Sequence, residues 1–475
     1  MGELKEKTLS GVKWNAIGRF STQGVSFFIS ILLARILTPS DYGVVGMIGI
    51  FMAIAQTFID SGFGSALIRK KDCTDEDFST AFYFNIAVGI VCYLILFLAA
   101  PLIADFFDTP ILRDIVRVLS INLFLNSLSI VQTAKLTAAV DFKSQAKVSL
   151  VATIVSGCVG LVMAYSGFGV WSLVYQSVSL SLVRTILFWI ITKWKPLRTF
   201  SKQSFKYLFG FGSKILSASL LHTIYVNLTT ILIGKFYTSK DLGYYTRGEG
   251  LANLPSSNLT NILQGVTYPI LAKIQDDDER LISVYRKYIR ITSMVIFFGM
   301  FLMAALSKPL ILTLLTDKWA NSIIYLQIFC FAYMFDHINQ LNLNILYVKG
   351  RSDLVLRLEI IKKTISISMI VAAIPFGVLA ICIARALYTQ IAVIINTYYT
   401  GKLFGLGYFA QVKDFIKYII YSLIAVLPAF LLSYTSILPI LALIAGVCIA
   451  GIIYWMLVHK NDDYVEVFNL IRRGR

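Results

Sequence analysis

Two stretches of the sequence nearly repeat each other at a distance of roughly two hundred residues. Residues 31–43 read ILLARILTPSDYG, and residues 231–243 read ILIGKFYTSKDLG. Each copy ends an apolar segment and turns into the next one. The spacing is far longer than the period of a solenoid, which is about 20–50 residues. The repeat therefore indicates two bundles built on one internal plan, a common architecture for a transporter with a central cavity.

The composition is that of a membrane protein. Of the 475 residues, 57% are hydrophobic and 15% are charged, whereas a soluble domain is nearer about half apolar and a quarter charged. A membrane-spanning helix needs about 20 mostly apolar residues, and no strand-like alternation is visible. We expect an all-α polytopic protein with about 14 transmembrane helices, near residues 11–34, 43–65, 80–104, 115–137, 147–166, 169–192, 211–234, 249–272, 288–307, 322–347, 357–375, 377–400, 416–433 and 437–458.

The links between these segments alternate between basic ones and short ones that are poor in Lys and Arg. Basic links mark the cytoplasmic side of a membrane, so both termini are predicted to be cytoplasmic. The same links account for the formal net charge of +17 without a nucleic-acid partner.

A second pair of landmarks supports the internal repeat. FGV occurs at residues 168–170 and again at 376–378, each time as a tight link late in its half of the chain. The predicted domains are a six-helix bundle over 1–206, a second six-helix bundle over 207–402, and an additional helix pair with a cytoplasmic tail over 403–475. Because both bundles begin on the cytoplasmic side, the repeats are parallel.

Motifs for covalent chemistry or for a cofactor are not found. The sequence has no phosphate-binding GxxxxGK[ST] loop, no HExxH, no GxSxG and no CxxC. Five of the six cysteines fall inside apolar segments, which favours packing residues over a metal or disulfide set. We therefore expect no enzyme activity, no catalytic residue, no metal and no cofactor, and no cleaved signal peptide.

Polar residues inside apolar segments are costly and need a reason. Segment 1 and segment 7 carry them at spacings of three and four, which places them on one helical face. Two such faces on equivalent helices indicate a hydrated substrate cavity; helix–helix hydrogen bonds and snorkelling toward the membrane surface are the alternative. The candidate cavity residues are Asn15, Arg19, Gln23, Lys214, His222 and Asn227.

Four further ionisable residues lie within or beside apolar segments. Asp60 lies near the cytoplasmic end of segment 2, Asp336 and His337 lie in the middle of segment 10, and Arg385 lies inside segment 12. The acids and the histidine are candidates for coupling to H⁺ or Na⁺. They would equally serve to neutralise a buried cation such as Arg385, and Asp60 has the alternative of a simple helix-end carboxylate.

Several stretches together resemble one transporter family. The 6+6+2 helix plan resembles the multidrug/oligosaccharidyl-lipid/polysaccharide exporter superfamily. Within it, the chain is similar to bacterial polysaccharide transporters of the colanic-acid or teichuronic-acid type. The resemblance covers nearly the whole chain and rests on GVKW (11–14) with LLARILTPSDYG (32–43), DSGFGSALIR (60–69), FGVWSLV (168–174) and YPILAKIQD (268–276).

This resemblance implies a flippase of the bacterial cytoplasmic membrane. Its substrate would be an undecaprenyl-diphosphate-linked oligosaccharide, moved from the cytoplasmic to the periplasmic leaflet by two lobes rocking about a central cavity. Cationic residues often line that cavity in the family, a role that Arg19, Lys214 and Arg385 would take here. The other implied partners are the lipid bilayer, a coupling ion and a polysaccharide polymerase.

Two other functions remain open at this point. A cation-coupled multidrug exporter of the same superfamily would favour acidic cavity residues, yet the predicted faces are richer in bases. A membrane glycosyltransferase or polymerase would usually need a sizeable extramembrane loop with catalytic acids, and the only acidic run is at 276–279.

Overall fold

The computed structural model describes residues 2–60, 62–70 and 73–473, and all regular structure in those ranges is helical. Their packing divides the chain into two compact units, residues 1–243 and 244–475. Unit 1 ends after the second copy of the repeated stretch. The domain boundaries expected at 206 and 402 stay predictions.

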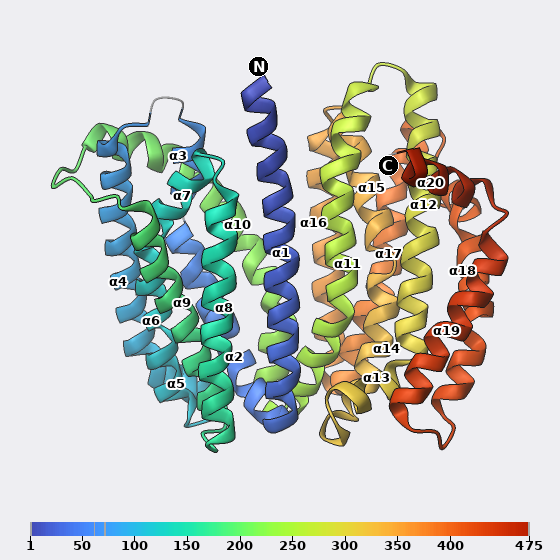
Figure 1. Cartoon of the computed structure of the whole chain (residues 1–475), viewed down its shortest axis with the longest axis horizontal. Coiled ribbons are helices and arrows are strands. Elements are labelled where there is room, and N and C mark those ends of the chain that lie inside the picture. Colours follow the sequence, from blue (N-terminus) through green and yellow to red (C-terminus); the bar gives the residue numbers. More distant parts are fainter. Residues whose placement is uncertain (1, 61, 71–72, 474–475) are drawn as a thin grey trace. The chain divides into compact units, whose positions relative to one another are not determined.

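The described residues of unit 1 form ten helices and the start of an eleventh. In chain order, they are α1 (Gly2–Ile36), α2 (Pro39–Asp60), α3 (Phe63–Arg69), α4 (Asp75–Phe106), α5 (Leu112–Leu119), α6 (Ile121–Ser127), α7 (Ile130–Ala138), α8 (Phe142–Tyr165), α9 (Val170–Thr192), α10 (Lys202–Phe236) and the start of α11 (Ser239–Lys273). The helices α8 and α9 run side by side (Figure 1).

Unit 2 takes most of α11 and all later helices. These are α12 (Asp278–Ala305), α13 (Ser307–Leu314), α14 (Ser322–Tyr333), α15 (Asp336–Val348), α16 (Ser352–Ala373), α17 (Val378–Phe404), α18 (Tyr408–Ser433), α19 (Pro439–Val458) and α20 (Asp462–Arg473), with short 3₁₀ turns η1 (Asp317–Trp319) and η2 (Ile374–Phe376). The antiparallel pair α18 and α19 packs on α12 and α13 (Figure 1).

The chain is an all-α, multi-pass membrane protein. Eleven segments of the described chain are long and apolar enough to cross a bilayer. The expected number of about 14 is not confirmed, because three predicted segments depart from an uninterrupted apolar helix. Segment 249–272 lies in α11 with two prolines, segment 322–347 is divided into α14 and α15, and α16 carries several charges.

The repeated stretch forms the same local structure twice. Thr38 and Thr238 each stand immediately before a helix, and Asp41 and Asp241 each lie three residues later. Each threonine donates its Oγ1 hydrogen to the aspartate Oδ2, at 2.7 Å and 2.6 Å, and each threonine backbone N–H donates to that same carboxylate. The recurring Thr-x-x-Asp is thus a capping arrangement that satisfies free donors at a helix start.

The two copies of the stretch also contact each other. The hydroxyls of Ser40 and Ser239 lie 2.7 Å apart. A Cβ added at Gly43 would lie 1.7 Å from the carbonyl oxygen of Ser239, and a Cβ added at Gly243 would lie 1.8 Å from that of Pro39. Both glycines are therefore required by the close approach of α2 and the start of α11.

The second pair of landmarks is confirmed as two matching tight links. Gly169 precedes α9 with φ of 54°, and Gly377 precedes α17 with φ of 99°. A residue with a side chain is disfavoured at such angles, so the glycine is the part of each FGV that the turn demands.

Candidate functional site

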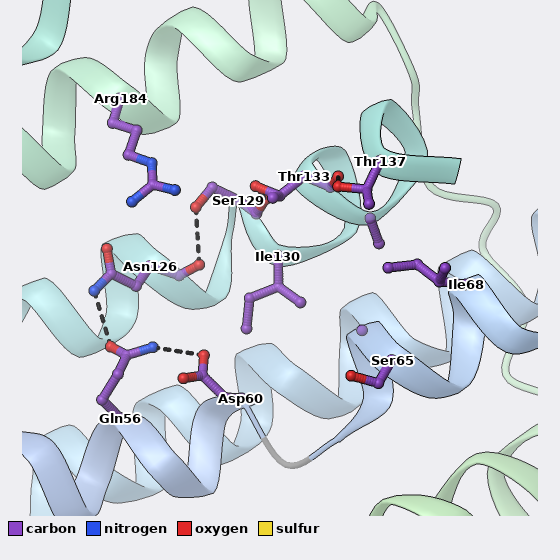
Figure 2. Close-up of a pocket in the computed structure, with 12 residues that line it drawn as sticks. Gln56, Asp60, Ser65, Ile68, Asn126, Ser129, Ile130, Thr133, Thr137 and Arg184 are labelled. Atoms are coloured by element: carbon purple, nitrogen blue, oxygen red, sulfur yellow. Dashed lines mark hydrogen bonds between the residues drawn. The ribbon is translucent and has the colours of Figure 1, made fainter. Parts of the chain in front are cut away.

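Unit 1 contains a polar cavity of about 560 Å³ between α2, α3, α6, α7 and α9. Most side chains that line it carry an oxygen or nitrogen, although the surrounding helices are apolar. Figure 2 shows them converging from different helices. The lining residues are Gln56, Asp60, Gly64, Ser65, Ile68, Asn126, Ser129, Ile130, Thr133, Ala134, Thr137 and Arg184.

A chain of side-chain amides leads to the carboxylate of Asp60 on one wall. Asn126 donates from Nδ2 to Gln56 Oε1 at 2.9 Å, and Gln56 donates from Nε2 to Asp60 Oδ1 at 2.9 Å. The chain holds the carboxylate at the end of α2, while Asp60 itself stays exposed. Asp60 thus retains acceptor sites for a ligand.

Three hydroxyls line the second wall along the turn before α7 and α7 itself. Ser129, Thr133 and Thr137 donate their hydrogens to backbone carbonyls three or four residues earlier, at 3.0, 3.0 and 2.8 Å. With these hydrogens used, each hydroxyl offers the cavity an oxygen that can accept. This wall therefore presents mainly acceptors.

Arg184 supplies the donors, from the opposite wall. Its side chain extends from α9 toward Asn126 and Ser129 (Figure 2), and its guanidinium lies 5.4 Å from the centre of the Phe188 ring. The guanidinium of Arg184 interacts electrostatically with Asp60. Among the described residues, however, no carboxylate forms an ion pair with Arg184 or accepts a hydrogen bond from it. Its five N–H donors therefore remain available to a ligand.

The backbone around Arg184 is fixed by its neighbours on α9. Thr185 donates to the carbonyl of Leu125, and Trp189 donates from Nε1 to that of Leu128, both at 2.9 Å. Both acceptors lie in the α6–α7 wall. The position of Arg184 across the cavity from Asp60 is thus built into the packing of α9.

Arg184 was missed by the sequence analysis, although a signal was present. It is the only charged residue between positions 169 and 192, and a lone cation in a spanning segment is a functional candidate by default. Matching polar faces on equivalent helices do not reveal it, because α9 does not contribute to that pattern.

The candidates on the first and seventh segments lie elsewhere in unit 1. Asn15 and Arg19 are exposed on α1 and Gln23 is half-buried. On α10, His222 is exposed, and Asn227 donates to the carbonyl of Thr223 at 2.8 Å. The side chain of Lys214 lies outside the described residues. The candidates that are described do not line the 560 Å³ cavity, and their substrate role stays a prediction.

Arg385 in unit 2 lies in a connected cluster of charges and hydroxyls. Its guanidinium pairs with Glu249 at 2.5 Å and donates to the hydroxyls of Tyr245 at 2.5 Å and Tyr333 at 3.1 Å. Tyr333 in turn donates to Glu249 at 2.9 Å. The cluster joins α11, α14 and α17 and neutralises the arginine within unit 2.

Asp336 and His337 are adjacent in sequence but have different partners. Asp336 Oδ2 accepts from Ser256 Oγ at 3.2 Å, whereas His337 Nε2 lies 2.9 Å from Ser293 Oγ and its ring packs on Phe297. His337 is fully buried. In the described part of the chain, no three His, Cys, Asp or Glu side chains are grouped so as to hold a metal ion.

The fold and the polar lining together define a multi-pass membrane protein with a polar cavity, and the sequence places it in a family. Residues 32–324 match the family described as "Polysaccharide biosynthesis protein", so the chain belongs to that family. The expected resemblance to polysaccharide transporters is thereby confirmed.

Relatives named for glycan biosynthesis match most of the chain. The teichuronic acid biosynthesis protein TuaB of Bacillus subtilis (strain 168) is 24% identical over 74% of this chain and 74% of its own length. The lipopolysaccharide biosynthesis protein WzxC of Escherichia coli (strain K12) is 25% identical, over 86% and 82%. The succinoglycan biosynthesis transport protein ExoT of Rhizobium meliloti (strain 1021) is 24% identical, over 67% and 64%.

Solved structures show the same fold. The lipid II flippase MurJ in an inward closed conformation gives a TM-score of 0.75 at 14% identity, covering 96% of this chain and 99% of that one. An inward-facing multidrug resistance MATE family transporter of the MOP superfamily gives 0.61 at 14% identity, covering 80% and 94%. At such identities the likeness concerns the fold alone, and it confirms the expected all-helical fold class.

Proposed function

We propose that the protein is a flippase for a lipid-linked oligosaccharide in surface polysaccharide biosynthesis. Its substrate is an oligosaccharide on undecaprenyl diphosphate, transferred from the cytoplasmic to the periplasmic leaflet of the bacterial cytoplasmic membrane. The observation that carries the proposal is membership of the polysaccharide biosynthesis family, together with a relative named as a transport protein. The fold shared with a lipid II flippase supports it.

The proposed mechanism is alternating access without covalent chemistry, so the protein is a transporter and not an enzyme. Arg19 and Lys214 would attract the anionic diphosphate, and Arg385 would do so once its ion pair with Glu249 opens. The polar residues Asn15, Gln23, His222 and Asn227 would bind sugar hydroxyls. Coupling to H⁺ or Na⁺ is proposed at Asp60, Asp336 or His337. Cytoplasmic termini and cooperation with a polysaccharide polymerase belong to the same proposal.

The same fold also occurs in multidrug transporters. The exposed cation Arg19 on α1 and the cation Arg184 in the cavity favour an anionic or polar substrate over a cationic drug. The three named relatives are all glycan proteins, which favours the flippase and gives no support to a glycosyltransferase.

Deletion of the gene tests the proposal. The lipid-linked oligosaccharide should accumulate on the cytoplasmic leaflet and surface glycan should fall, and the wild-type chain should restore both. Reversing two cations, Arg19→Glu with Lys214→Glu, should reduce export by at least about tenfold, because attraction for the diphosphate becomes repulsion. Surface glycan quantified in the complemented strain measures this.

The matched control is Lys195→Glu, which reverses an exposed cation in the link between α9 and α10. It should leave export unchanged. Full export by the double-reversal variant would exclude these two residues from substrate binding, and unchanged lipid-linked pools after deletion would reject the flippase itself.

A further inference from the structure

We propose that the cavity in unit 1 is a carbohydrate subsite that holds a sugar unit of the glycan between Arg184 and Asp60. The inference rests on the proposed function and adds a binding place for the glycan. It assigns Asp60 to hydroxyl binding in place of ion coupling, and it gives Arg184, Gln56 and Asn126 a shared role.

The two charged groups of the cavity define the kind of ligand. Asp60 only accepts hydrogen bonds and Arg184 only donates them, and they stand on opposite walls without forming an ion pair. Each hydroxyl of a sugar both donates and accepts. One sugar unit can therefore donate to Asp60 and accept from Arg184 at the same time.

Simple ions fit this lining poorly. A metal cation at Asp60 would share the cavity with the guanidinium of Arg184, and a phosphate at Arg184 would share it with the carboxylate of Asp60. The formal charges of the lining sum to zero, which suits an uncharged, hydroxyl-rich group. Burying the separated charges of Arg184 and Asp60 also costs the least free energy when polar atoms of a ligand lie between them.

The remaining lining matches the other surfaces of a sugar ring. The oxygens of Ser129, Thr133 and Thr137 accept hydrogen bonds from hydroxyls, while Ile130 and Ala134 offer apolar contacts to C–H groups. A volume of about 560 Å³ lies within the roughly 300–1,000 Å³ of small-molecule sites. One sugar ring with its hydroxyls fits inside.

The cavity also lies where a glycan would arrive. Its hydroxyl wall continues to Thr137, one residue before the end of α7. Lys135 lies in the same turn of α7, and Lys143 and Lys147 follow at the start of α8. Such basic stretches mark the predicted cytoplasmic side. The subsite is therefore placed to receive the sugar before transfer.

Protection of an introduced cysteine tests the subsite. In a chain whose six native cysteines are replaced, Thr133→Cys is labelled by a small uncharged thiol reagent in lipid nanodiscs. The probe is the oligosaccharide released by mild acid from the lipid-linked pool of the host strain. At a fixed pH it should slow labelling at Cys-substituted position 133, whereas inorganic pyrophosphate and NaCl should not.

Two variants test whether Arg184 and Asp60 bind the oligosaccharide. Arg184→Gln and Asp60→Asn should each raise the half-protecting concentration by about tenfold, since each removes a charged hydrogen-bond partner. If Arg184 and Asp60 only stabilise each other, the double variant should recover protection by the oligosaccharide. If both bind the oligosaccharide, the double variant should be protected less than either single variant. The matched control is Ser166→Cys in the exposed α8–α9 link, whose labelling should ignore the oligosaccharide.

The other outcomes overturn the inference in distinguishable ways. Protection by pyrophosphate alone would make the cavity a phosphate site, and protection by Na⁺ alone would return Asp60 to ion coupling. If deletion of the gene abolishes export but no probe protects position 133, the subsite is wrong and the flippase stands. If deletion leaves export intact, the proposed function fails and the subsite falls with it.

Discussion

Two arginines inside spanning helices show how differently one residue type can be used. Arg385 has a carboxylate and two phenol hydroxyls within hydrogen-bond distance. Arg184 faces a cavity and stacks on one ring. The first arrangement satisfies the cation inside the protein, and the second leaves its donors for a ligand. A sequence reading cannot separate the two, because the partners of Arg385 lie on α11 and α14, far away in the chain.

Substitution should therefore affect the two arginines differently. Arg385→Gln leaves Glu249 without its ion-pair partner, a loss of up to about 3–5 kcal/mol in the free energy of unfolding for a fully buried pair. A smaller loss is expected here, because the side chains of Arg385 and Glu249 are still 23% and 21% exposed to solvent. Arg184→Gln breaks no pair and should change stability little. Thermal unfolding in detergent measures both.

The double variant Glu249→Gln with Arg385→Gln is the control. Removing both charges should recover part of the lost stability, since no unpaired carboxylate remains. Equal unfolding temperatures for Arg385→Gln and Arg184→Gln would show that the cluster around Arg385 does not stabilise unit 2.

At the scale of elements, two glycines determine how closely α2 and the start of α11 approach. Gly43→Ala and Gly243→Ala should each destabilise the protein by at least about 1–3 kcal/mol, because the new Cβ would lie 1.7 or 1.8 Å from a backbone carbonyl oxygen. Folded yield and unfolding temperature report the effect. Gly49→Ala in the same helix α2 meets no atom within 4 Å and should be neutral or stabilising.

The buried carboxylate of Asp463 joins the start of α20 to α12 and α18, and Glu466 of α20 also pairs with Lys287 of α12. Asp463 accepts from Tyr418 at 2.5 Å, Arg290 at 2.9 Å and Lys417 at 3.1 Å. Burial alone raises the pKa of Asp463, but these partners outweigh it and hold the pKa below the ordinary 3.8. The stabilisation is therefore complete above about pH 4 and disappears as the pH falls through the lowered pKa.

Asp463→Asn should accordingly release α20 at neutral pH. Amide hydrogen exchange in α20 should be faster than in the wild type at pH 7, and the two proteins should converge once the carboxyl of the wild type is protonated. Asp462→Asn is the matched control, because that neighbouring side chain is exposed. Unchanged exchange in Asp463→Asn would show that α20 is held by its other contacts instead.

At the scale of the molecule, composition predicted the fold class and the repeat predicted matching local structure. Periodicity could not give the cavity, because its walls come from five helices whose contacts depend on tertiary packing. The sequence shows Asp60 as an isolated acid. Its hydrogen-bonded connection to Asn126 runs through Gln56, and Gln56 and Asn126 are 70 residues apart in the chain. The expected number of spanning helices is not confirmed, because the expected segment 322–347 is divided into α14 and α15 and eleven segments of the described chain are long and apolar enough to span.

The glycine contact has a consequence for both copies of the repeated stretch. Each copy of the repeated stretch touches the other copy with corresponding residues: Gly43 meets Ser239, and Gly243 meets Pro39. Such reciprocal contact is the mark of an isologous interface, which normally joins two identical subunits. Because both contacts join the same two helix starts, a side chain at either glycine would displace both copies of the stretch, so the two glycines must be retained together.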